Sequence, residues 1–285
     1  MPLPLPLPTL NLIGAGRVAQ TLATLWHRRG SFVIQDVLTT SLTSAQSACT
    51  VIGAGHAVQS MQAMRQADVW MLAVTDAQIA GCAQSMAERI ALDRQASSTA
   101  PIVFHCSGAQ SAVTLAPLAA LSWRVASSHC ILSFASVSAA LQQFPGTPCA
   151  LEGDALACDA LRPAFTAIGA RCFDVASSDK LLYHAAAVFA TNFLPVLQSS
   201  AEDLWRFTGV PADLIPHLRE SLLRNAVANI TALGPQAALT GPAARGDTAA
   251  IARQGAAVAS WDAQTGAVYT ALSELALRLA QKQQD

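Results

Sequence analysis

The chain has 285 residues, of which 52% are hydrophobic and 12% charged, and its formal net charge is −1. This length is natural for two domains, and so small a charge offers no field that would attract nucleic acid or an acidic membrane. Seven cysteines, an odd number without paired spacing, are more typical of a reducing cytosol than of a disulfide framework. We therefore expect a cytoplasmic protein, and no Cys and His spacing suggests a metal site.

The first residues, 1–8, alternate proline with apolar residues, which predicts a disordered leader rather than a signal-type helix. No segment has the roughly 18 uninterrupted apolar residues of a membrane span, so we expect no membrane partner. The most apolar helical stretch, 185–197, contains Thr191, Asn192 and Pro195.

Two copies of Gly-Ala-Gly lie about forty residues apart, and a dinucleotide-binding turn needs a strand before it and a full helix after it. The first copy has both: a strand at Leu10–Ile13, then Gly14, Gly16 and Ala19, then a helix to Arg29. Such a helix offers free N–H groups and a positive dipole end to the pyrophosphate. We interpret this copy as the fingerprint.

The second copy follows a helical segment and has the bulkier Val58 where the first has Ala19. We expect its glycines to end one helix and to start a short strand at His56–Val58.

Strand-like runs alternate with helical stretches through the first half of the chain, which predicts an α/β fold with a doubly wound, mostly parallel Rossmann-type sheet. The runs are Leu10–Ile13, Phe32–Leu38, Val69–Val74, Ile102–His105 and Trp123–Ala126. A helix at Asp154–Gly169 and a strand at Arg171–Val175 complete a dinucleotide-binding domain, 1–176. From about residue 177 nearly everything reads as helix, which predicts an all-α substrate or dimerisation domain, 177–285.

The tip of the second strand decides between NAD and NADP, because an acidic residue there binds the ribose 2′-hydroxyl and repels a 2′-phosphate. Val37 and Leu38 continue the strand beyond Asp36, which leaves Thr39–Ser41 at the tip. Hydroxyl groups favour NADP, although no Arg supplies charge and NAD stays open. The predicted cofactor-binding residues are Gly14, Ala15, Gly16, Arg17, Val18, Thr39, Thr40, Ser41, Val74, Thr75 and Asp76.

In the second half, we expect Ser177 or Ser178 to cap a long helix that continues to Phe207, with a kink at Pro195. Lys180 and His184 share one face of it, and Asn192 lies at the edge of that face. The alternative is an exposed lysine and a core histidine. Further helices are predicted at Ala212–Leu233 and Thr248–Lys282. Between them an irregular loop carries Thr240 and Arg245, and Asp247 is placed to cap the last helix.

Several phrases, in this order and spacing, resemble bacterial two-domain proteins with a Rossmann-like half and a helical domain of unknown function. They are LIGAGRVAQTLA, ADVWMLAVTDAQIA, HCSGAQSAVTLAPL, ASSHCILSFA, KLLYHAAAVFATNF and NITALGPQAALTGPAARGD. These proteins are described as NADP-dependent oxidoreductases and are similar in architecture to ketopantoate reductase, pyrroline-5-carboxylate reductase and deazaflavin-dependent NADP reductases. The resemblance implies a homodimer built by the helical domain and an active site in the cleft between domains.

The phrase KLLYH also resembles the ketopantoate reductase segment in which Lys and, four residues on, Asn face the substrate; Lys180 and His184 take these positions. This chain departs from the family pattern at Thr75 and Cys130, where Pro is usual, and at Thr39–Thr40, where Ser-Arg is usual. The last change weakens the expectation of NADP.

The leading hypothesis is an NAD(P)H-dependent reductase that transfers hydride to a C=O or C=N carbon of a small substrate, with a carboxylate as one option. His184 is the expected general acid, because histidine titrates near neutral pH, and Lys180 polarises the acceptor. Ser107, His129, Asn192, Thr240 and Arg245 are expected to bind the substrate. The rival hypothesis is a non-catalytic nucleotide- or metabolite-binding protein on the same fold, since fold does not dictate chemistry.

Overall fold

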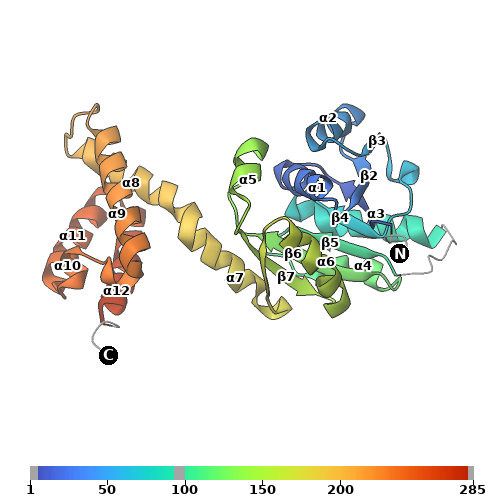
Figure 1. Ribbon diagram of the computed structural model, residues 1–285. Helices are drawn as coiled ribbons and strands as arrows, with labels where there is room; N and C mark the ends of the chain where they lie inside the picture. Colours follow the sequence, from blue (N-terminus) through green and yellow to red (C-terminus); the bar gives the residue numbers. More distant parts are fainter. Residues whose placement is uncertain (1–5, 93–99, 282–285) are drawn as a thin grey trace. The chain divides into compact units, whose positions relative to one another are not determined.

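The computed structural model describes residues 6–92 and 100–281, and eight strands of this part form one sheet in the order β3-β2-β1-β4-β5-β6-β7-β8 (Figure 1). Neighbouring strands run parallel except β6 and β7, which confirms the doubly wound, mostly parallel sheet. The strands are β1 (Thr9–Ile13), β2 (Val33–Leu38), β3 (His56–Val58), β4 (Val69–Leu72), β5 (Ile102–His105), β6 (Arg124–Cys130), β7 (Pro148–Gly153) and β8 (Arg171–Asp174).

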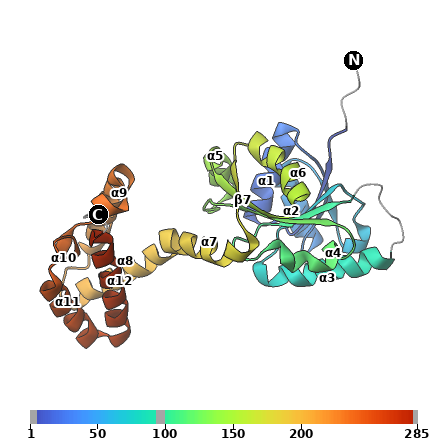
Figure 2. The same cartoon turned by 90° about the horizontal axis from the view of Figure 1, so that it is seen from below.

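Helices cover both faces of the sheet, so the strands are buried on both sides and read as continuous apolar runs. Figure 2 shows α3 (Asp76–Leu92) and α4 (Ala116–Ala119) on one side and α1 (Arg17–Arg29) and α6 (Ala155–Ala167) on the other. Along β4 the side chains alternate between two core clusters, as the two-residue period of a strand requires. This part also contains α2 (Leu42–Ile52) and α5 (Val137–Gln143).

The core under α1 is centred on Trp26, which is fully buried. Its indole ring makes edge-to-face contacts with Phe32 and Phe165, with ring centroids 5.3 and 5.1 Å away, and its N–H donates to the Ala164 carbonyl. Aromatic pairs of this geometry add about 0.5–1.5 kcal/mol beyond their area burial. This packing fixes α1, and with it the turn that precedes α1, against the sheet.

A buried polar group holds β1, β2 and the segment before β4 together. The Asn11 side chain donates to the Arg65 carbonyl and accepts from the backbone N–H of Asp36. The Asp36 carboxylate in turn accepts hydrogen bonds from the backbone N–H of Arg65, at 2.7 Å, and from its guanidinium, at 2.6 Å. Asp36 is therefore a structural residue inside β2, as the sequence placed it, and the tip of the strand lies beyond Leu38.

One predicted strand is longer than expected, and one strand was not predicted. The strand expected at Trp123–Ala126 is β6, and it continues to Cys130, so Ser127 and His129 lie within a strand and not in a loop after it. The cause is β7, a strand that we did not predict, which pairs antiparallel with this half of β6. The short strand β3 follows the second Gly-Ala-Gly and has the predicted bounds, His56–Val58.

The described chain divides into two compact units, Met1–Val188 and Phe189–Asp285. The first unit extends past residue 176, because Lys180, at the start of α7 (Lys180–Ala187), is buried against this unit. The second unit contains α8 (Phe193–Phe207), α9 (Ile215–Ala237), α10 (Gly241–Ala244), α11 (Thr248–Trp261) and α12 (Ala263–Gln281), which confirms a helical region after the sheet.

Several helix boundaries differ from the expectation. The helix expected from residue 177 to Phe207 contains a π-helical turn at Val188–Asn192, before Pro195. Such turns relieve the clash of a helical proline with the carbonyl of the turn before it. Neither Ser177 nor Ser178 caps α7, because Ser177 donates to Glu152 and Ser178 to Asp179.

The predicted helix at Thr248–Lys282 is two helices. Asp262 has extended φ and ψ angles and its side chain accepts from the Thr265 N–H, so it caps α12. Asp247 caps α11 as expected, and the expected irregular loop before it contains the short helix α10.

Among the described residues, one helix, Ser177–Phe207, is long and apolar enough by length and composition to cross a membrane, with a mean hydropathy of 1.3. A single helix of this kind is weak support for a membrane protein, because core helices of soluble proteins pass the same test.

The Asp36–Arg65 pair predicts a pH-dependent stability. Burial alone raises the pKa of Asp36, but hydrogen bonds and charge from Arg65 outweigh it and lower that pKa below its ordinary 3.8. The contribution of the Asp36–Arg65 pair to the free energy of unfolding is therefore fully present above pH 3.8, and it is lost as the pH falls through the lowered pKa of Asp36. We expect Arg65→Ala to lower the free energy of unfolding by about 1–3 kcal/mol at neutral pH, and by less in acid.

Urea denaturation at pH 7 and at a pH below 3.8 measures both effects. Arg162→Ala is the matched control, because it removes the partner of Asp174, whose side chain is 72% exposed. An exposed pair contributes about 0–1 kcal/mol. Equal losses in the two variants, or a loss in Arg65→Ala that does not shrink in acid, would contradict this account.

Candidate functional site

A cavity of about 730 Å³ opens at the carboxyl ends of β1, β2 and β4, where ligands of open α/β sheets bind. The first Gly-Ala-Gly forms its floor, and the tip of β2 and the loop after β4 form its sides. Its lining residues are Ile13, Gly14, Ala15, Gly16, Gln20, Leu38, Thr39, Thr40, Thr43, Ser44, Ser47, Met61, Ala73, Val74, Thr75, Gln78 and Cys82.

The two glycines of the first turn meet different constraints. Gly14 has a φ of +82°, and a Cβ there would lie 2.5 Å from the Ala73 carbonyl oxygen, so no side chain fits. Gly16 precedes α1 and has no atom within 4 Å of the place of a Cβ. No side chain caps the N-terminus of α1, which leaves its first N–H groups for a ligand. This open, uncapped turn suits a phosphate group.

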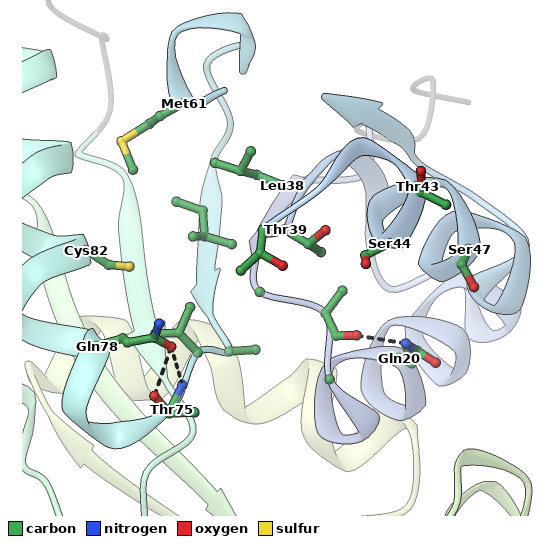
Figure 3. Close-up of a pocket in the computed structure, with 17 residues that line it drawn as sticks. Gln20, Leu38, Thr39, Thr43, Ser44, Ser47, Met61, Thr75, Gln78 and Cys82 are labelled. Carbon is green, nitrogen blue, oxygen red and sulfur yellow. Dashed lines mark hydrogen bonds between the residues drawn. The ribbon is translucent and has the colours of Figure 1, made fainter. Parts of the chain in front are cut away.

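Hydroxyl groups line one side of the cavity. Thr43, Ser44 and Ser47 lie on α2 next to Thr39, opposite Met61, Gln78 and Cys82 (Figure 3). All the lining residues within the described part of the chain are uncharged. The cavity thus has no carboxylate to repel a 2′-phosphate and no Arg to attract one.

The second Gly-Ala-Gly has the structural role that the sequence predicted. Gly53 ends α2 in the left-handed conformation, and Gly55 precedes β3 with a φ of +97°. A Cβ on Gly55 would lie 3.1 Å from Val37, so this turn packs on the core and does not face the cavity.

The other predicted cofactor contacts are placed as follows. Arg17 begins α1 and donates to the Ala135 carbonyl, and Val18 packs against the core. Ser41 caps α2 by accepting from the Ser44 N–H, and it is not among the lining residues of the cavity. Asp76 begins α3 and accepts a hydrogen bond of 2.7 Å from Ser107. The Asp76–Ser107 bond joins the start of α3, which directly follows the cavity-lining residues Val74 and Thr75, to the loop after β5.

Lys180 lies at the end of β5, beside β6, and is 1% exposed. Its Nζ donates to the Ser107 carbonyl at 3.0 Å and to Ser127 Oγ at 3.1 Å. Burial lowers the pKa of Lys180, and the charges of Glu152 and other groups raise it again, leaving it below its ordinary value. The lysine is therefore deeply buried and not the exposed one of the alternative interpretation.

His129 is held neutral. Burial, followed by the charge of Lys180 and then His184, lowers its pKa to about 4. Its Nδ1 lies 2.8 Å from the hydroxyl of Tyr183, whose pKa burial raises to about 12. The phenol thus stays protonated and shares one hydrogen bond with Nδ1, whose donor depends on the ring tautomer, and the other ring nitrogen is Nε2. This nitrogen borders Gly108, where a Cβ would lie 2.8 Å from it.

His184 packs against the same glycine. A Cβ on Gly108 would lie 2.5 Å from His184 Nδ1, and Nδ1 is buried without a hydrogen-bond partner. The rings of His184 and His129 meet edge to face at 5.8 Å. Because Nδ1 is covered, Nε2 is the nitrogen of His184 that remains for a ligand.

The structure thus brings Lys180, His184, Ser107 and His129 together in the first unit. Asn192, Thr240 and Arg245 lie in the second unit, and their part in substrate binding stays a prediction. Within the described residues, no three His, Cys, Asp or Glu side chains are grouped to hold a metal ion.

Sequence reasoning missed several residues of this region. Glu152, on the unpredicted β7, is 3% exposed, and an acidic residue within the apolar run PCALEG was its signal. Tyr183 could have been found from its helical spacing to Lys180. Thr43 and Ser47 lie one turn apart on α2, which indicates a polar helix face but not a ligand.

Comparisons with known proteins agree with this architecture. Residues 6–123 match the Rossmann-like domain, and residues 147–276 match DUF2520, a domain of unknown function. The second match begins before β7, so Glu152 and Lys180 belong to it together. A search of curated protein sequences finds no match.

Solved structures with a similar fold include a protein from Thermotoga maritima, 22% identical, with a TM-score of 0.76 over 97% of this chain and 100% of that one. A proposed NADP oxidoreductase from Bacteroides fragilis is 20% identical, with a TM-score of 0.68 over 96% and 98% of the two chains. Pyrroline carboxylate reductase from Plasmodium falciparum, solved with NADP bound, is 10% identical, with a TM-score of 0.55 over 96% and 98%. At these identities the likeness shows the fold alone.

Proposed function

We propose that this protein is an NADPH-dependent reductase that transfers hydride to a C=O or C=N carbon of a small substrate. The observation that carries the proposal is the adjacency of two features. The open cavity over Gly16 is joined, through the Asp76–Ser107 hydrogen bond, to the cluster of Lys180, His129 and His184. A nicotinamide cofactor carries the redox chemistry, and the protein orients it and supplies a proton.

The pyrophosphate binds at the N-terminus of α1, above Gly16. The 2′-phosphate of NADPH binds at the hydroxyl groups of Thr39, Thr40, Thr43 and Ser44. The lack of a carboxylate at the tip of β2 supports NADPH, and Asp36 is already bound to Arg65. NAD remains the alternative, because no Arg lines the cavity among the described residues.

At the acceptor, Lys180 stabilises the negative charge that develops on oxygen or nitrogen during hydride transfer. His184 donates the proton through Nε2, since its Nδ1 is covered by Gly108. His129, neutral at pH 7, takes part as a hydrogen-bonding ring and not as an acid. A carboxylate on the substrate is the natural complement of Lys180.

A homodimer through the helical unit is part of the proposal. Large apolar side chains of this unit are exposed in the single chain, including Phe207 at 71% and Leu233 at 59%. Exposed apolar surface of this extent marks an interaction face. The same unit carries the ion pairs of Glu202 with Arg206 and Arg219, which suit a protein partner in water better than lipid.

The first test is a fluorescence titration with NADPH and, separately, NADH. We expect micromolar binding of NADPH and weaker binding of NADH. Gly16→Ala adds a methyl group where the pyrophosphate binds, so NADPH affinity falls at least about ten-fold, or 1.4 kcal/mol. Its folded stability is unchanged, because nothing lies within 4 Å of that methyl group.

Gly55→Ala is the matched control in the second Gly-Ala-Gly. It strains a turn with a φ of +97° and lowers Tm, while NADPH affinity is retained. Binding of neither nucleotide to the wild type would remove the reductase proposal. Binding without NADPH consumption by any carbonyl or imine acid would favour the non-catalytic binding protein.

The second test concerns the proton donor. We expect His184→Ala to lower turnover by about 10²–10⁴-fold, the usual contribution of a positioned acid, and to spare NADPH affinity. Stopped-flow NADPH oxidation with the first active carbonyl or imine acid measures it. His217→Ala, at an exposed histidine on α9, is the control. Turnover that survives in His184→Ala would show that another group supplies the proton.

A further inference from the structure

The sequence has only two lysines, Lys180 and Lys282, against fifteen arginines. Lys180 is nevertheless the cation buried at the end of β5 and beside β6, where its hydrogen-bond partners are a carbonyl and a hydroxyl. Among the described residues, no carboxylate forms an ion pair with it. A buried ammonium without compensating charge is costly and tends to lose its proton.

A compensating charge lies one hydroxyl group away. Glu152 pairs directly with Ser127 across the antiparallel β6 and β7. Its Oε2 accepts a hydrogen bond of 2.7 Å from Ser127 Oγ and another of 2.9 Å from the Ala112 N–H. Its Oε1 accepts one of 2.6 Å from Ser177. Three donors from three different segments therefore hold this carboxylate in one orientation.

The chemistry of the groups fixes the direction of each hydrogen bond. An ammonium only donates and an ionised carboxylate only accepts, so the single Ser127 proton points to Glu152 and a lone pair of its oxygen faces Lys180. The hydroxyl is thus polarised by both charges at once. A neutral amide in place of Glu152 would remove the charge that orders this arrangement.

We propose that Glu152 is the positioning residue for Lys180, and that through Ser127 it keeps the buried ammonium charged and in place for the acceptor. This inference rests on the proposed function for the role of Lys180, but not for the contact itself. A charged lysine stabilises negative charge that develops on the acceptor, whereas a neutral amine does not.

The titratable groups that face Lys180 come from every element packed around it. They are Glu152 and Cys149 on β7, Asp76 on α3, His105 and Cys106 at the end of β5, His129 on β6, and Tyr183 on α7. Burial raises the pKa of Cys106 to about 12, and the hydrogen bond to Cys130 raises the pKa of Cys149, so both thiols stay protonated. The pKa of His129 is about 4, so this ring is neutral. The carboxylates of Glu152 and Asp76 are thus the charges that support Lys180, and Glu152 shares a hydroxyl with it.

The test is a pH titration of Lys180 by NMR, in full-length protein that carries ¹³C-labelled lysine and Lys282→Arg. A single lysine signal remains, so it needs no further assignment. In Glu152→Gln we expect the midpoint to fall to lower pH, with the ratio of charged to neutral lysine about ten-fold smaller at the wild-type midpoint. Asp154→Asn is the control, because its carboxylate contacts Arg124 and α6 and not Ser127. A Glu152→Gln midpoint equal to that of Asp154→Asn overturns the proposal.

A second pair of variants serves if Glu152→Gln does not fold. Ser127→Ala and Ser177→Ala each remove one hydroxyl donor from Glu152, but only Ser127 also contacts Lys180. We expect a lower lysine midpoint in Ser127→Ala and a wild-type midpoint in Ser177→Ala, and equal midpoints overturn the proposal. The NMR titration needs no cofactor or substrate. Failure of NADPH binding therefore removes the proposed function alone, and an unchanged lysine midpoint removes the Glu152 assignment alone.

Discussion

The close contact between Gly14 and Ala73 places the carboxyl ends of β1, β2 and β4 around one cavity. No Cβ fits at Gly14, whose N–H also donates to the Leu38 carbonyl. Two residues after Gly14 the chain reaches Gly16, and α1 begins there without a capping side chain. The one backbone constraint thus determines both the shape of the cavity and the direction in which free N–H groups face it. The packing of Trp26 under α1 keeps that direction fixed.

The second part of the site depends on burial of charge. Lys180 reaches from α7 to the loop after β5 and to the middle of β6, and the polar atoms that receive it belong to distant parts of the chain. The antiparallel β7 is essential here, because it brings Glu152 opposite Ser127. A plain parallel sheet that ended at β6 would have no carboxylate at this position. The match to DUF2520 includes β7 as well as α7, which agrees with one functional unit made of both.

The cavity could be predicted from the sequence because its determinants are local. A strand, Gly14, Gly16 and a full helix follow one another in the chain, and the placement of Asp36 behind the strand tip followed from the apolar residues after it. The extent of β6 and the existence of β7 could not, because antiparallel pairing of Ser127 with Glu152 is a long-range contact. The break at Asp262 was missed for a different reason: the flanking segments have the same helical pattern, and a single capping side chain separates them.

The neutral state of His129 was also outside the reach of the sequence. It results from burial and from Lys180, which approaches from more than fifty residues away. The helical spacing of Lys180 and His184 did predict that they share one helix face. The burial of His184 Nδ1 against Gly108, however, depends on tertiary packing, which the sequence does not show. The structure therefore adds to the predicted site those residues that interact with one another across different strands.

The crystal structure of the protein with NADPH tests the central claim most directly. The account predicts the pyrophosphate at the N–H groups that follow Gly16 and the 2′-phosphate at the hydroxyls of Thr39, Thr40, Thr43 and Ser44. It further predicts that the nicotinamide lies beside Ser107, within reach of the Lys180 and His184 cluster. A dinucleotide bound elsewhere, or one whose nicotinamide points away from that cluster, would contradict the assignment of this site to hydride transfer.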